Sequence, residues 1–191
     1  MSQTLPRPMT ADEFLEWDTL QPDCRHELID GVAVAMTGAR QQHDAIRENV
    51  SGLAWQQLRG KKCRSFSPDL ALRMPNGNVR RPDVGVHCPP FDSNALFAAN
   101  PVMVVEVLSP STRAVDLARK LGEYWSVPSM RFVLLIEPDM PQVTFWWRTE
   151  QFWDSRVFEG LDAAVEMTEL NLHLTLVDIY EGLTFAPRLV A

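Results

Sequence analysis

The sequence lacks the long apolar segments that mark membrane and secreted proteins. No apolar run among its 191 residues approaches the roughly 20 residues that a membrane-spanning helix needs. The first residues, MSQTLPRPMTADEF, contain no apolar stretch of the kind that a secretion signal requires. We therefore expect a cytoplasmic protein that has no membrane partner.

Cysteine is scarce as well. Cys24, Cys63 and Cys88 are the only three, they lie far apart, and no two form a CxxC pair. An odd number at wide spacing argues against a disulfide framework and against a cysteine zinc site. We expect three free thiols in a reducing compartment. The motifs GxGxxG, GxSxG and HExxH and the phosphate-binding P-loop are also missing, so a small-molecule enzyme on another α/β scaffold has little support.

The net charge of −7 argues against a protein whose role is to coat nucleic acid. The charge is unevenly distributed, because residues 1–136 hold 15 acidic and 15 basic side chains, whereas residues 137–191 hold 10 acidic and 3 basic. The neutral part contains two basic clusters, which are either solvated faces or contacts for phosphate groups. They consist of Arg59, Lys61, Lys62 and Arg64, and of Arg73, Arg80 and Arg81.

The length and composition predict one domain over residues 1–191. Helical spacing and capping patterns predict helices over 10–18, 41–58 and 113–125 and a short one near 176–183. A hairpin over 26–36 turns at Asp30-Gly31. Further strands are expected over 63–66, 69–74, 79–87, 102–108, 131–136 and 143–148. This order predicts an α/β (α+β) fold with a mixed central β-sheet flanked by helices.

Two carboxylates stand at unusual positions. Glu106 interrupts the apolar run Val102–Leu108, where an isolated buried charge is costly unless it is neutralised or paired. Asp83 follows Pro82 inside a strand pattern, and such irregular positions often redirect a side chain. Each carboxylate has an ordinary alternative, which is a paired or exposed strand-end residue. If the two point into one cleft, they could bind a hard divalent cation such as Mg²⁺.

Three further polar residues are candidates for the same site. Lys120 lies on the stripe Arg113, Asp116, Lys120 and Tyr124, at the margin of the apolar face of its helix. Its alternative is a surface pair with Asp116. Glu27 is either an exposed hairpin residue or a member of the site. His43 is either a surface histidine or, because its helix begins shortly after the hairpin, a side chain that reaches the site.

Taken together, these segments resemble the Uma-two family of restriction-endonuclease-like proteins, a branch of the PD-(D/E)XK nuclease superfamily. The matching segments, in order, are ELIDG from Glu27, RPDV from Arg81, VVEVLSPSTR from Val104, and the spaced Asp116, Lys120 and Tyr124. The resemblance runs from about Met9 to Phe185, and the segment from Glu106 to Arg113 is its most specific part.

The resemblance implies a restriction-endonuclease-like core and hydrolysis of DNA. Asp83 and Glu106, with the backbone carbonyl of Val107, are then expected to bind Mg²⁺ or Mn²⁺. The superfamily usually has its catalytic lysine two residues after the glutamate, but Leu108 stands there. The family pattern puts the lysine on the next helix, at Lys120. Glu27 matches the acidic residue that the superfamily often supplies from its first segment.

Two functions from different classes remain open. The chain is either a Mg²⁺-dependent DNA endonuclease or a nuclease-fold binding or regulatory module with little turnover. A homodimer is also expected, because cutting two strands needs two sites and two-fold pairs are the commonest oligomers. The aromatic residues of Phe145-Trp146-Trp147 and Phe152-Trp153 either form apolar surface for that dimer or cap the sheet.

Overall fold

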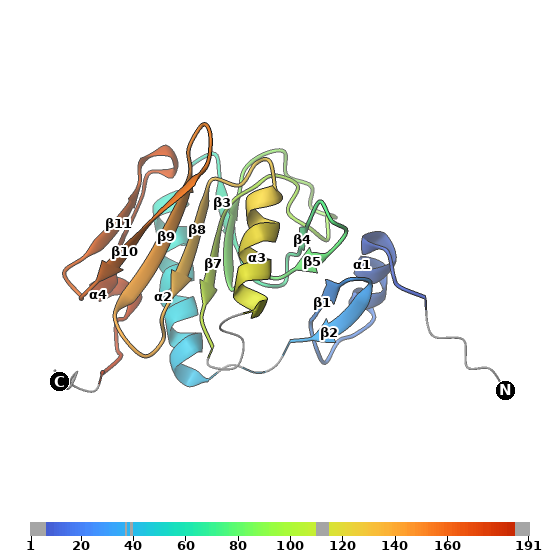
Figure 1. The fold of residues 1–191 in the computed structure, drawn as a ribbon, viewed down its shortest axis with the longest axis horizontal. Helices are drawn as coiled ribbons and strands as arrows, with labels where there is room; N and C mark the ends of the chain where they lie inside the picture. Colours follow the sequence, from blue (N-terminus) through green and yellow to red (C-terminus); the bar gives the residue numbers. More distant parts are fainter. Residues whose placement is uncertain (1–6, 37, 39, 110–114, 186–191) are drawn as a thin grey trace.

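The computed structural model describes residues 7–36, 38, 40–109 and 115–185, and its centre is a six-stranded sheet (Figure 1). The strand order is β10-β9-β8-β7-β6-β3. β7 and β8 are parallel, whereas the other neighbours are antiparallel, so the sheet is mixed as predicted. The strands are β3 (Arg64–Phe66), β6 (Val84–His87), β7 (Pro101–Val107), β8 (Phe132–Ile136), β9 (Gln142–Arg148) and β10 (Trp153–Glu159).

Two helices cover opposite faces of this sheet, α2 (Gln41–Leu58) and α3 (Val115–Ser126) (Figure 1). Side chains alternate between the faces of a strand, so β7 contributes to both layers. Met103, Val105 and Val107 pack in the cluster that includes α2, and Val104 packs in the cluster that includes α3. Glu106 therefore belongs to the α3 face.

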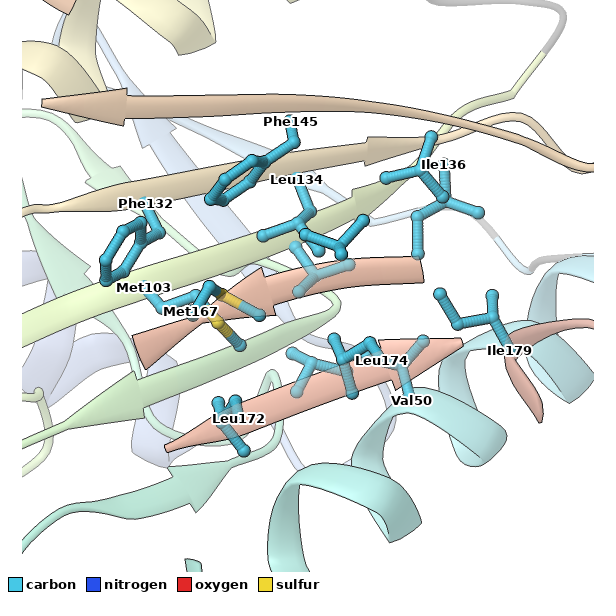
Figure 2. Close-up of a cluster of buried hydrophobic side chains, with 14 of the residues drawn as sticks. Val50, Met103, Phe132, Leu134, Ile136, Phe145, Met167, Leu172, Leu174 and Ile179 are labelled. Atoms are coloured by element: carbon cyan, nitrogen blue, oxygen red, sulfur yellow. The ribbon is translucent and has the colours of Figure 1, made fainter. Parts of the chain in front are cut away.

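The largest apolar core lies on the α2 face of the sheet (Figure 2). It is closed by a two-stranded hairpin of β11 (Ala164–Met167) and β12 (Leu172–Thr175), with a 3₁₀ turn (Thr168–Leu170) between them and the short helix α4 (Leu176–Ile179) after them. Figure 2 shows side chains from the sheet, from α2 and from this hairpin meeting in one layer. The acidic C-terminal third of the chain thus completes the core and does not form a separate lobe.

A second sheet lies beside the N-terminal helix α1 (Ala11–Thr19). Its order is β2-β1-β5-β4, and its strands are β1 (His26–Ile29), β2 (Val32–Ala35), β4 (Leu72–Arg73) and β5 (Val79–Arg80). The hairpin turns at Asp30 and Gly31, whose φ angles of 51° and 80° fit the Asp-Gly turn that the sequence predicts. Thr10 and Glu13 form the expected capping box at the start of α1.

The single strand expected over 79–87 is wrong, because the chain divides there between the two sheets. Val79 and Arg80 pair in the four-stranded sheet, and Val84 begins a strand of the six-stranded sheet. Pro82 lies at the crossing, where it has no N–H group to give to a ladder. The strand expected over 69–74 is also reduced to β4. The start of the helix predicted over 113–125 lies outside the described residues.

The expectation of three free thiols is also wrong, because Cys63 and Cys88 form a disulfide with a Cα–Cα distance of 4.2 Å. They flank an antiparallel pair in which Arg64 lies opposite His87, so they face each other one residue beyond it. Only Cys24 keeps a free thiol within the described ranges. No helix in those ranges is long and apolar enough to cross a bilayer.

The disulfide should contribute measurably to stability, because it closes a segment with a sequence separation of 25 residues. Because the cross-link lowers the chain entropy of the unfolded state, it is expected to stabilise the folded state by about 3 kcal/mol. Replacing both Cys63 and Cys88 with serine should therefore lower the free energy of unfolding by about that amount in denaturant titrations. Reduction of the wild-type protein should have a similar effect, and it should leave the double variant unchanged.

Candidate active site

Glu106 is the buried carboxylate at the centre of the site. It is 8% exposed and lies near the end of β7, facing α3. The hydroxyl of Tyr124 donates a hydrogen bond to its Oε1. The ammonium of Lys120, one turn earlier on α3, lies 3.3 Å from Oε1 and 3.4 Å from Oε2. Lys120 therefore faces Glu106 in the folded chain.

Burial raises the pKa of Glu106 to about 7 from an ordinary value near 4.5. Lys120 opposes the rise by favouring the carboxylate, and the nearby negative charges of Asp83 and Glu27 add to it. Burial and the Glu106 carboxylate raise the pKa of Tyr124 well above its usual value, so this hydroxyl remains a donor. Near pH 7 the Glu106 carboxyl is therefore only partly ionised.

This shift predicts how stability depends on pH. The pKa of Glu106 is higher in the folded than in the unfolded chain, so its contribution to stability is complete below about pH 4.5 and is lost as the pH rises through about 7. In EDTA, the free energy of unfolding of the wild type should fall relative to Glu106→Gln by roughly 3 kcal/mol between about pH 5 and pH 8. Denaturant titrations across that range would reveal it. Parallel pH profiles for the two proteins would contradict the shift.

Asp83 reaches the same place from the crossing between the two sheets. The register that pairs Val84 with Val105 continues to Asp83 opposite Glu106. Its Oδ2 accepts a hydrogen bond of 2.8 Å from the Val107 amide, and it lies 3.3 Å from Nε2 of His43. The hydrogen bond to Asp83 raises the pKa of His43. His43 thus reaches the site and is not a surface histidine.

Glu27 is the third carboxylate, and it comes from the other sheet. Its Oε2 accepts a bond of 2.8 Å from Arg80, and its Oε1 accepts one of 3.0 Å from the Arg81 amide. Its Oε1 also lies 3.6 Å from the Lys120 ammonium. Lys120 therefore stands between Glu27 and Glu106 and joins the two sheets electrostatically.

Arg80 and Arg81 are buried. The sequence suggested that their basic cluster is either a solvated face or a contact for phosphate groups, and burial excludes both for these two residues. Arg80 is fully buried between Glu27 and Glu123, and its Nε lies 2.5 Å from the Glu123 carboxylate. Arg81 is paired with Asp18 at 2.6 Å. Sequence reasoning missed this network, because each pair joins residues more than 40 positions apart and no local pattern marks them.

Glu27, Asp83, Glu106 and Lys120 all line one open cleft of about 1810 Å³. Val107 and His43 line it as well. Arg25, Arg40 and Arg47 also line the cleft and retain solvent exposure, although Arg25 is paired with Asp69 and Arg47 with Asp44 and Glu48. A cleft of this kind suits an elongated polyanion that approaches a cation site.

The donors at the centre suit a hard dication, because they are carboxylate oxygens and one peptide carbonyl. In the part of the chain that the structure describes, however, no three His, Cys, Asp or Glu side chains form a ready cage. Glu106 is engaged by Lys120 and Tyr124, and Asp83 by His43 and the Val107 amide. These residues fit a cation that would displace Lys120 from Glu106 and His43 from Asp83.

The aromatic segment does not form the surface that was expected for a dimer. Phe145 is buried in the core of the α2 face, and Trp147 packs partly against it. Trp146 and Trp153 pack with Trp125 of α3 on the other face. Only Phe152 of the five is largely exposed, at 60%. These rings therefore cap the sheet, which was the alternative interpretation.

Comparison with known proteins gives three kinds of match. A family model described as "Uma2: Putative restriction endonuclease" matches residues 11–177. Two uncharacterized proteins of Synechocystis are similar along most of their length. One, slr1290, is 31% identical and covers 96% of this chain and 98% of its own; the other, sll1609, is 27% identical and covers 86% and 95%. The crystal structure of a putative nuclease from Anabaena variabilis has a TM-score of 0.70 at 24% identity, over 91% of this chain and 98% of that one, which shows a shared fold.

Proposed function

The chain belongs to the Uma2 family of putative restriction endonucleases, and on that premise we propose that it is a divalent-cation-dependent DNA endonuclease. The observation that carries the proposal is the meeting of three carboxylates and one lysine in a single cleft. Glu27, Asp83, Glu106 and Lys120 come from two sheets and a helix, yet they share that cleft and the electrostatic contacts described above. A structural role alone gives no reason to concentrate negative charge there.

The cation would be held by the carboxylates of Asp83 and Glu106 and by the Val107 carbonyl. Mg²⁺ and Mn²⁺ both accept such oxygen donors. When bound, the ion supplies positive charge to the phosphate and lowers the pKa of a water molecule. Asp83 is prepared for this role by the Val107 amide, which fixes one of its oxygens.

Lys120 would orient the attacking water and balance the charge that develops on the phosphate. Its ammonium already lies within 3.6 Å of both Glu27 and Glu106. Glu27 would hold that ammonium in the cleft, because Arg80 and the Arg81 amide fix the Glu27 carboxylate from behind. This arrangement would replace the lysine that Leu108 does not supply.

DNA would lie along the cleft and contact the exposed arginines at its sides. Cutting both strands would require two such sites, so we retain the homodimer as part of the proposal, although the aromatic segment does not supply its interface. The competing function is a nuclease-fold binding module, and the observation that favours it is Leu108 at the usual lysine position.

The experiment is incubation of supercoiled plasmid DNA with the purified chain in Mg²⁺, in Mn²⁺ and in EDTA. We expect nicked and linear plasmid with either ion and neither product in EDTA. Each cut should leave one phosphate end and one hydroxyl end, as phosphodiester hydrolysis requires. Retardation of DNA on gels with intact plasmid in both ions would instead support the binding module. Sedimentation of the protein with and without DNA would test the homodimer.

A further inference from the structure

β10 is a free edge of the six-stranded sheet. It is the last strand in the order, so it pairs with β9 on one side only. Its central residues, Asp154 to Val157, are all exposed, and Val157 keeps 50% of its surface. Native proteins usually protect such an edge with a very short strand, a bulge, a covering segment or charged side chains. β10 has seven residues in an unbroken register with β9, so only its charged side chains remain as a possible protection.

The hydrogen-bond pattern shows which backbone groups of β10 face this free edge. At one end of the pair, the Thr149 N–H donates to the Phe152 carbonyl at 2.8 Å. At the other end, the Gly160 N–H donates to the Pro141 carbonyl at 3.0 Å. Bonded and non-bonded pairs alternate along an antiparallel ladder, so the even-numbered residues of β10 bond to β9. The backbone groups that point away from the sheet include those of Trp153, Ser155 and Val157.

The sequence around Ser155 is self-complementary when β10 pairs antiparallel with a copy of itself. With Ser155 opposite Ser155, each residue meets the residue that lies equally far on the other side of that serine. The remaining pairs are Phe152 with Phe158, Trp153 with Val157, and Asp154 with Arg156. Aromatic pairs, pairs of an aromatic with a β-branched residue, and opposite charges are the cross-strand combinations that stabilise antiparallel sheets. This register also gives an apolar partner to Phe152, which is 60% exposed.

The neighbouring registers lose this complementarity. A pair centred on Arg156 sets two guanidinium groups against each other, and a pair centred on Asp154 does the same with two carboxylates. Like charges directly opposite each other are destabilising. A pair centred on Val157 leaves Arg156 opposite Phe158, without an acidic partner. The two charged residues therefore exclude the wrong registers and favour a single one, which a merely protective pair of charges would not need to do.

We propose that β10 pairs with β10 of a second copy of this chain, in the register centred on Ser155, so that the two six-stranded sheets become one. Trp153 would exchange backbone hydrogen bonds with Val157 of the second copy, because the N–H and C=O groups of both point outward. The contact supplies the interface of the homodimer in the proposed function, on which it rests for that homodimer alone and not for any nuclease activity.

The charged side chains would change partners when the two copies meet. In the single chain, the Asp154 carboxylate accepts a hydrogen bond of 2.8 Å from the Ser155 N–H, one of the outward-facing groups. The Arg156 guanidinium lies 5.0 Å from the centre of the Phe158 ring. No ion pair of either charged residue is found in the described part of the chain. In the dimer, Asp154 would release the Ser155 N–H to the second copy and bind the Arg156 of that copy.

The first test is the solution mass of the whole chain, by sedimentation velocity over a series of micromolar concentrations. Asp154→Arg and Arg156→Asp should each weaken dimerisation by at least about 10-fold, because two-fold symmetry repeats each new like-charge contact. The double variant Asp154→Arg/Arg156→Asp restores the opposite charges and should dimerise within about 3-fold of the wild type. Glu169→Arg is the matched control, since it reverses an exposed charge on the 3₁₀ turn outside β10, and it should change nothing.

The second test reads the register directly, in a Cys24→Ser background that removes the free thiol. Residues 154 and 156 would form a pair without mutual backbone bonds, whose Cα atoms stand about 4.5 Å apart, within the range of a disulfide. Asp154→Cys/Arg156→Cys should therefore give a covalent dimer on non-reducing gels after mild oxidation. Either cysteine variant alone should give none, because its two thiols would lie two positions out of register.

The outcomes separate this interface from the nuclease. A monomeric wild type overturns the interface, and so does a dimer that persists unchanged in both single charge variants. Covalent dimers that form as readily from one of the single cysteine variants would show a different register and would also overturn it. Plasmid cleavage by the same samples is scored independently. A dimeric wild type that cuts no DNA with either ion overturns the proposed endonuclease and leaves the interface standing.

Discussion

Glu106→Gln should abolish DNA cleavage, with a rate at least about a thousandfold below that of the wild type. Glutamine keeps the size of the side chain and an oxygen that can accept the Tyr124 hydrogen bond. It loses the negative charge that would hold the cation, and a loss of about 4 kcal/mol of transition-state stabilisation corresponds to that factor. The measurement is the rate of plasmid nicking in saturating Mn²⁺.

The variant should also fold well, because glutamine has no charge to bury. Glu166→Gln is its matched control, since Glu166 lies on β11 with a side chain 69% exposed. That control should cleave at the wild-type rate. Cleavage by Glu106→Gln at a comparable rate would remove Glu106 from the mechanism, whatever the behaviour of the other site residues.

Lys120→Ala should also eliminate cleavage, by a different route. Its ammonium contacts the Glu106 and Glu27 carboxylates, so its loss removes the group proposed to orient the water and to balance charge on the phosphate. Loss of one such electrostatic contact typically costs on the order of 100- to 1000-fold in rate. Lys120→Arg should recover only part of the rate, because guanidinium is planar and bulkier than an ammonium ion.

Metal binding separates this effect from that of Glu106. Lys120→Ala should bind Mn²⁺ at least as well as the wild type, because a competing positive charge has been removed from beside Glu106. Lys61→Ala is the matched control, since Lys61 follows α2 and its ammonium is bonded to the Asn171 carbonyl. Wild-type cleavage by Lys120→Ala would show that the catalytic lysine has not moved to α3.

The parts of the fold that the sequence predicted well are those whose pattern is local. The helix over 41–58 and the hairpin at Asp30-Gly31 are confirmed, because apolar spacing and turn residues determine both. β10 was not predicted, because four consecutive residues from Asp154 to Val157 are exposed and give no clear alternation. The hairpin of β11 and β12 was missed in the same acidic tail, because each of its strands has only four residues, although their buried side chains alternate with exposed ones.

The same distinction between local and distant patterns explains which parts of the candidate site could be predicted. Glu106 could be found because a carboxylate inside an apolar strand is chemically out of place, and its neighbourhood bears this out. The Arg80–Glu123 pair could not be found, because its members lie 43 positions apart and each looks ordinary in its own segment. The Cys63–Cys88 bond was missed for the same reason, since it depends on how two strands pair and not on the spacing of the cysteines.

The distribution of the site over two sheets also affects what happens during synthesis of the chain. β7, which carries Glu106, lies between β6 and β8, and β8 is made only when translation has reached Ile136. Lys120 and its helix are likewise made long after Glu27. Domains acquire their non-local contacts only when the distant segments are present. A nascent chain that still lacks β8 therefore cannot complete the sheet that holds Glu106 in its cleft.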